Sequence, residues 1–144
     1  MFTGDRSGDW IYRALYKAGI ASQPTSESLE DGLILTGALI CAVAHCAPPD
    51  NKPTPDEIQN CSVFLLRILG SRHWKSILCL GGIAWEQSLR RLGEPRKQFK
   101  HGQTAVTAGG TTIIASYHPS QQNTFTGRLT EEMLDDAVGL WLHV

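Results

Sequence analysis

The sequence predicts an α/β domain in three layers, with a mainly parallel central sheet flanked by helices, and three observations support this class. Helical patterns alternate along the chain with short apolar runs, as expected for parallel strands joined by helices. The run LILTGALICAVAHC is almost continuously apolar, which suits a strand covered on both faces. The chain has 144 residues, 42% of them apolar, and can bury one core. We therefore expect a single domain over residues 1–144.

The first third of the chain is expected to hold a helix, a loop and a strand. The stretch DRSGDWIYRALYKAG predicts a helix: its apolar residues share a face, Ser7 or Asp9 can accept the first free amides, and Gly19 can end it. The polar stretch 21–32 has no periodicity and predicts a loop. The apolar run that follows predicts a strand at 38–45.

The remaining elements follow from local signals. A threonine cap, a proline and a capping-box glutamate predict a helix over 55–70. The stretch SILCLGG at 76–82 predicts a short apolar strand that ends in two glycines, and IAWEQSLRRLG at 83–93 predicts the helix after it. Residues 99–116 resemble a loop and hairpin that lead to another strand, and Thr130 caps a last helix with one apolar side.

Charge and hydropathy limit the possible classes of protein. The chain carries 13 basic and 14 acidic residues, so no broad positive field indicates nucleic acid, although a small positive groove is compatible with this total. No apolar run of about 18 residues could span a bilayer, and the N-terminus does not resemble a signal peptide. We therefore expect a cytoplasmic protein without a membrane partner. Its four cysteines favour reduced, core or metal-binding thiols over a disulfide framework.

Three loops are expected to meet beyond the carboxyl ends of the strands, where open α/β sheets bind their ligands. These loops are AHCAPPDNKPT, LGGIAW and SYHPSQQNTFTGRL. The first resembles a metal or partner loop. Gly82 in the second lies in a Gly-Gly turn before a helix whose first backbone amides could meet a phosphate, but glycines there also permit close packing of helix on strand.

The third loop changes abruptly from a buried strand to polar residues. His118 at the strand end is either a structural histidine or a catalytic one, and Pro119 stiffens the backbone beside it. Hydrogen-bonding side chains follow, of the kind that contact phosphates and base edges, with a solvated surface loop as the alternative. They include Ser120, Gln122, Asn123 and Arg128.

The motif SYHPSQQNTFTGRLT resembles the hallmark of the type 5, or type B, uracil-DNA glycosylases. The segments FTGDRSGDWIYRALYKAG, CAPPDNKPTPDEIQNC and LGGIAW also resemble that family, in its order, so the resemblance covers essentially the whole chain. It implies a parallel sheet flanked by helices. It also implies removal of uracil, and in many members of other deaminated bases, from DNA after the base has rotated out of the stack.

The resemblance assigns roles to individual residues. His118 would stabilise the anion of the departing base, and Asp5 would position or activate the attacking water. The residues alone favour a helix cap for Asp5. Gln122, Asn123 and their neighbours would contact DNA. Ala42 departs from related enzymes that carry an asparagine there, which leaves more of the work to Asp5 and backbone groups.

A 4Fe-4S cluster is also implied by the resemblance. Cys46 and Cys61 match two of its four thiolate ligands, whereas Cys41 and Cys79 lie in apolar segments and favour core packing. We expect the other two ligands, the first strand of the family and its GLAP-type motif to precede Met1, so that the chain is incomplete at its N-terminus.

The leading interpretation is a monomeric DNA-repair glycosylase of a bacterial cytoplasm, associated with the nucleoid. We expect it to be monofunctional, because no lysine occupies an obvious nucleophile position in the matched motifs. Two alternatives remain open at this point. One is a catalytically incompetent DNA-binding remnant of the same fold. The other is an unrelated α/β hydrolase that acts on a small nucleotide.

Overall fold

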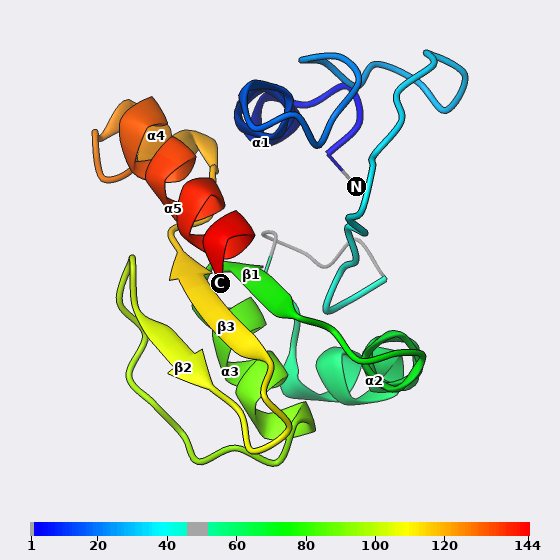
Figure 1. The fold of residues 1–144 in the computed structure, drawn as a ribbon, viewed down its shortest axis with the longest axis vertical. Helices are drawn as coiled ribbons and strands as arrows, with labels where there is room; N and C mark the ends of the chain where they lie inside the picture. Colours follow the sequence, from blue (N-terminus) through cyan, green and yellow to red (C-terminus); the bar gives the residue numbers. More distant parts are fainter. Residues whose placement is uncertain (1, 46–51) are drawn as a thin grey trace.

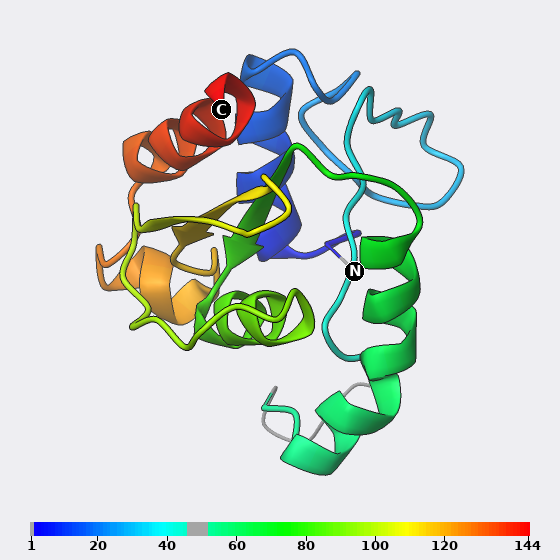
Figure 2. The ribbon, with the colours of Figure 1, turned by 60° about the horizontal axis from the view of Figure 1, so that its bottom comes forward.

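The computed structural model describes residues 2–45 and 52–144, which form five helices and three strands (Figure 1). In chain order these are α1 (Arg6–Lys17), α2 (Pro55–Gly70), β1 (Ser76–Leu80), α3 (Gly82–Arg91), β2 (Thr104–Val106), β3 (Thr112–Ser116), α4 (Gln121–Phe125) and α5 (Glu131–His143). Figure 2 shows α1 and α5 on one side of the sheet and α3 on the other. The α/β class with helices on both faces is therefore confirmed.

The sheet has the strand order β1-β3-β2. β1 pairs in parallel with β3, with Ser76 opposite Thr112, and β2 pairs antiparallel with β3. The predicted hairpin supplies the antiparallel pair, so the sheet of the described residues is mixed. Successive residues of β1 alternate between the two faces: Leu78 packs towards α1 and α5, and Cys79 packs in the cluster around α3.

The predicted strand at 38–45 is wrong. These residues have no strand structure, and the bridge before them joins Ala21 to Leu35 alone. They are mostly half-buried, which explains their apolar composition, and they line a cleft rather than pair with β1. A continuous apolar run indicates burial, whereas a strand also needs a partner for its backbone groups.

The helix predictions are confirmed, except for the cap of α1 and for one short helix that was not predicted. α1 is capped by Asp5, which accepts a hydrogen bond from the backbone of Gly8, and not by Ser7 or Asp9. α2 begins at Pro55 with both bonds of its capping box in place. The loop after β3 contains the short helix α4, which the sequence analysis missed. No helix among the described residues is long and apolar enough to cross a membrane.

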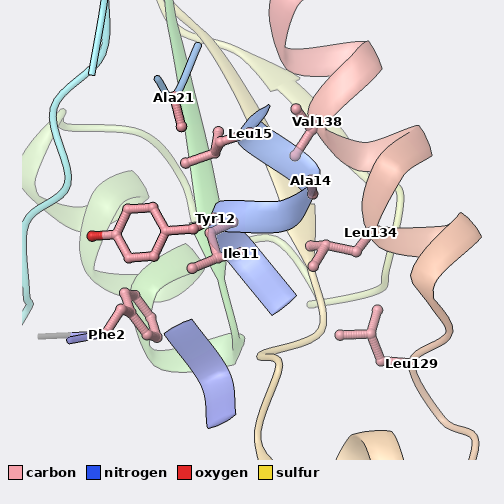
Figure 3. Close-up of a cluster of buried hydrophobic side chains, with 9 residues drawn as sticks. All are labelled: Phe2, Ile11, Tyr12, Ala14, Leu15, Ala21, Leu129, Leu134 and Val138. Carbon is pink, nitrogen blue, oxygen red and sulfur yellow. The ribbon is translucent and has the colours of Figure 1, made fainter. Parts of the chain in front are cut away.

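The larger core cluster joins α1 to α5 (Figure 3). Ile11 and Leu15 of α1 are one helical turn apart and both buried. Leu134 and Val138 of α5 have the same spacing and pack against them. Phe2 belongs to this cluster, and its packing places the start of the chain close to the end of β3.

Candidate active site

A cleft of about 1120 Å³ opens between the start of α1, residues 38–43, the start of α3 and the loop after β3. All the residues predicted for catalysis or DNA contact line it. They are Asp5, Gly82, His118, Ser120, Gln122, Asn123 and Arg128. Cys61 is not among the lining residues, and Cys46 lies outside the described residues. The second and third predicted loops therefore converge at the expected end of the sheet.

His118 follows β3 directly and projects into this cleft as a half-buried side chain. Burial lowers the pKa of His118 below its ordinary value, and the nearby Asp5 carboxylate acts in the opposite direction. The imidazole is therefore neutral at neutral pH. A neutral ring can donate one hydrogen bond to a developing anion.

Asp5 caps α1 and also lines the cleft. Its Oδ1 accepts the Gly8 amide at 2.6 Å and caps α1, while its carboxylate lines the cleft near His118. A carboxylate has two oxygens and several lone pairs, so a cap bond at Oδ1 leaves acceptor capacity at Oδ2. The arrangement can hold a water molecule or stabilise positive charge opposite His118.

Phe2 is a lining residue that the sequence analysis did not assign. Its ring centroid lies 5.7 Å from that of His118, with the ring planes 33° apart. Its φ of 58° lies in the left-handed region, and a Cβ on Gly8 would lie 2.1 Å from the Phe2 carbonyl oxygen. The position of Phe2 therefore requires glycine at residue 8. The only sequence signal was a glycine three residues after Asp5.

The polar loop after His118 is held in place by its own hydrogen bonds. Ser120 caps α4 and accepts the Asn123 amide at 3.4 Å. The Asn123 side-chain nitrogen donates to the His118 carbonyl at 2.9 Å. Fully buried Leu129 anchors the end of the loop through its amide, which donates to the Asn123 carbonyl at 3.0 Å. Gln122 and Arg128 are exposed and line the cleft.

The cleft has a different charge balance from the whole chain. Arg6, Lys52 and Arg128 line it, whereas Asp5 is the single acidic residue among the described lining residues. The Arg128 guanidinium lies 4.6 Å from the centroid of the Tyr117 ring, which helps to hold it over the cleft. This local excess of positive charge suits an anionic ligand despite the net charge of −1.

The glycine turn before α3 serves packing and leaves backbone amides free. Gly81 has φ 97°, and a Cβ there would touch the Cβ of His118 at 3.4 Å. A Cβ on Gly82 would lie 3.6 Å from the Phe99 ring. No side chain caps α3, and its first residues line the cleft, so the helix also presents N–H groups there. Phosphate binding at the start of α3 and close packing of this helix on the strand are both compatible with this geometry.

The predicted cluster ligands are only partly described. The Cys61 sulfur accepts the His45 amide at 3.3 Å, which places the residue that precedes Cys46 in sequence at this thiol. Within residues 2–45 and 52–144, no group of three or more potential ligands comes together. Cys79 is buried in the core as expected, with its pKa raised to about 11, whereas Cys41 lines the cleft. The described residues alone do not fit a four-thiolate cluster, and we derive no catalytic step from one.

This α/β fold, with a polar histidine loop at the end of its sheet, matches a known class. Residues 1–140 match the family model described as "Uracil DNA glycosylase superfamily", and the chain belongs to this superfamily.

Within the superfamily, the chain is similar to proteins named "Type-5 uracil-DNA glycosylase". It is 48% identical over 141 residues to the one from Mycobacterium bovis, covering 94% of this chain and 53% of the relative. It is 41% identical over 138 residues to the one from Pyrobaculum aerophilum, covering 96% of this chain and 61% of the relative. It is 44% identical over 136 residues to the one from Thermus thermophilus, covering 92% of this chain and 61% of the relative. The resemblance found in the motifs is confirmed, and the chain spans 53% to 61% of the length of these relatives.

Proposed function

We propose that this chain carries the catalytic cleft of a DNA-repair glycosylase that hydrolyses the N-glycosidic bond of uracil in DNA. The observation that carries the proposal is the placement of Asp5 and His118 in one cleft, beside the ring of Phe2. The names of its relatives support uracil as the base removed and DNA as the substrate. We extend the proposal to other deaminated bases because Ala42 lines the cleft without a polar group to select uracil.

In the proposed reaction, the bond between the base nitrogen and C1′ of the sugar breaks, and its electron pair leaves with the base. The neutral His118 ring donates a hydrogen bond to the base carbonyl oxygen, where negative charge develops. The Asp5 carboxylate faces the sugar, which gains positive charge, and accepts a proton from the water that bonds to C1′. Water is the nucleophile, so the enzyme is monofunctional.

The base reaches this cleft only after it leaves the DNA stack, as in other enzymes that act on a base. The Phe2 ring provides an apolar face on which a flipped base can stack. Exposed Gln122 and Arg128 grip the strand, together with Ser120 and the first amides of α3 at Gly82. Asn123 contributes by holding the histidine loop, through its bond to the His118 carbonyl.

We further propose that Cys46 and Cys61 hold part of a 4Fe-4S cluster with a structural role. The bond from the His45 amide to the Cys61 sulfur supports it, since amide donors stabilise thiolate ligands. The remaining ligands must come from outside the described residues. Replacing Cys61 by serine in the longest natural protein that contains residues 1–144 should lower its iron and sulfide content. An unchanged iron content would remove Cys61 from the cluster.

Single-turnover excision from duplex DNA with one uracil tests the proposed activity, again in the longest natural form. His118→Ala should slow the chemical step by about 10² to 10³-fold while DNA affinity changes little. His143→Ala, at the exposed end of α5, is the matched control and should leave the rate unchanged. An unaffected chemical step in His118→Ala would remove this role. DNA binding without excision by the unaltered protein would favour the DNA-binding remnant instead.

A further inference from the structure

His101 lies outside the cleft lining, at a distortion of the β2–β3 hairpin. β2 pairs regularly with β3 up to Thr104, which lies opposite Ile114. At the next pair the Ala115 amide donates to the Gln103 carbonyl at 2.8 Å, and the Gly102 amide donates to the Ala115 carbonyl at 2.8 Å. Gly102 and Gln103 therefore both lie opposite Ala115, and this arrangement is a β-bulge.

Glycine permits this bulge, because Gly102 has φ 75°. Bulges turn the chain and redirect a side chain, and they are frequent beside active sites. Here the redirected side chain is that of His101, the residue before the bulge. Its Nδ1 accepts the Tyr117 amide at 3.1 Å. The imidazole therefore serves as the acceptor for the first peptide N–H beyond β3.

The ring of His101 is fixed by several contacts. It stacks on the Tyr117 ring, with centroids 5.1 Å apart and planes 26° apart. Burial lowers its pKa, and the Met133 backbone and the Asp136 carboxylate, both in α5, act in the opposite direction. An Nδ1 that accepts a hydrogen bond must be unprotonated, so the proton of the neutral ring is on Nε2.

We propose that His101 is a positioning residue, which orients His118 by holding the peptide group between Ser116 and Tyr117. The inference rests on the proposed function, since it assigns His101 a part in the same reaction. Two hydrogen bonds flank the His118 backbone: His101 holds the amide of Tyr117, and Asn123 holds the carbonyl of His118 itself. Neither partner reaches the reacting atoms, and each limits the rotation of the backbone that carries the imidazole.

These two hydrogen bonds explain how the His118 backbone is held beyond the end of β3. His118 leaves β3 where regular sheet pairing stops, so the ladder alone does not fix its backbone. A misplacement of about 1 Å in a catalytic group can cost about 10²-fold in rate. The His101 side chain, from the residue before the bulge, accepts the Tyr117 amide where the β2 backbone no longer pairs with β3.

Two amide variants of the longest natural protein test the proposal. His101→Asn places its Oδ1 near the position of Nδ1 and preserves the acceptor, whereas His101→Gln extends the amide past it. We expect His101→Asn to retain single-turnover excision within about threefold, and His101→Gln to lose about 10-fold or more, both with unchanged DNA affinity. Equal rates in the two variants would overturn the proposal, since a merely structural histidine would not distinguish them.

Nuclear magnetic resonance provides a readout that needs no activity. The unaltered protein should show a scalar coupling across the hydrogen bond between the Tyr117 amide nitrogen and His101 Nδ1. The imidazole signals of His118 should broaden or divide in His101→Gln and not in His101→Asn. An absent coupling, or His118 signals that are identical in both variants, would overturn the inference. If the unaltered protein excises no base, the proposed function fails, and these signals still decide whether His101 positions His118.

Discussion

The side-chain nitrogen of Asn123 donates a hydrogen bond to the backbone carbonyl of His118 over 2.9 Å. The sequence motif suggested that Asn123 would touch DNA, but its amide already has a partner within the protein. The backbone of Asn123 is also bonded, to Ser120 and to Leu129. This residue therefore ties the polar loop to the histidine.

Replacing Asn123 by alanine should slow excision by about 10-fold, because the His118 carbonyl loses the partner that orients it. DNA affinity should change little. Gln122→Ala is the matched variant, since Gln122 is exposed on the same short helix and lines the same cleft. It should weaken binding more than it slows chemistry. Single-turnover kinetics and equilibrium binding separate the two effects, and the same loss of affinity in both variants would contradict the assignment.

Arg128 is expected to contact a DNA phosphate from its position over Tyr117. Arg128→Ala should weaken binding to damaged and undamaged duplexes alike. It should also reduce the slope of log affinity against log salt concentration by about 0.9, the value for one phosphate contact. Arg90→Ala, near the opposite end of α3 from the cleft, should leave the slope unchanged. An identical slope in the Arg128 variant would mean that this arginine does not meet the backbone.

Gly8 and Gly139 provide a matched pair of glycine substitutions in helices. A Cβ on Gly8 would lie 2.1 Å from the Phe2 carbonyl oxygen, so Gly8→Ala should displace Phe2, cost about 1–3 kcal/mol of stability and reduce excision. A Cβ on Gly139 meets nothing within 4 Å, so Gly139→Ala should stabilise α5 by about 0.5–1 kcal/mol. Chemical denaturation measures both changes, and equal stabilities would disprove the close approach of Phe2 to α1.

Two half-buried histidines should make stability depend on pH. Burial lowers the pKa of His118 and of His101 below 6.5, the ordinary value that they regain in the unfolded chain. The unfolded state therefore binds protons first as the pH falls. Their contribution to the free energy of unfolding is fully present above 6.5, decreases as the pH drops through this value, and levels off below the folded-state pKa values.

Urea unfolding at about pH 7.5 and at about pH 5.5 tests this dependence. The unaltered protein should be less stable at the lower pH, and the double variant His118→Asn, His101→Asn should show a smaller difference. A ring titration of His118 with a midpoint above its ordinary value would contradict the direction of the shift.

The amino-acid sequence by itself determined the elements whose signals are local. The capping box at Thr54 and the threonine cap at Thr130 each specify the start of a helix through residues only a few positions apart. Such signals depend on backbone hydrogen bonds that the segment makes with itself or with its own cap. The motif around His118 also identified the family, and the polar residues that it contains line one cleft.

Only the tertiary structure decided which residues meet. The apolar run at 38–45 lines the cleft instead of forming a strand, because pairing requires a partner that its own sequence cannot supply. Asp5 caps α1 because the chain enters this helix from Phe2, which packs over Gly8. His101 lies 16 residues before Tyr117 in sequence and reaches it beside a β-bulge. These relationships depend on contacts between segments that are distant along the chain, and no local pattern records them.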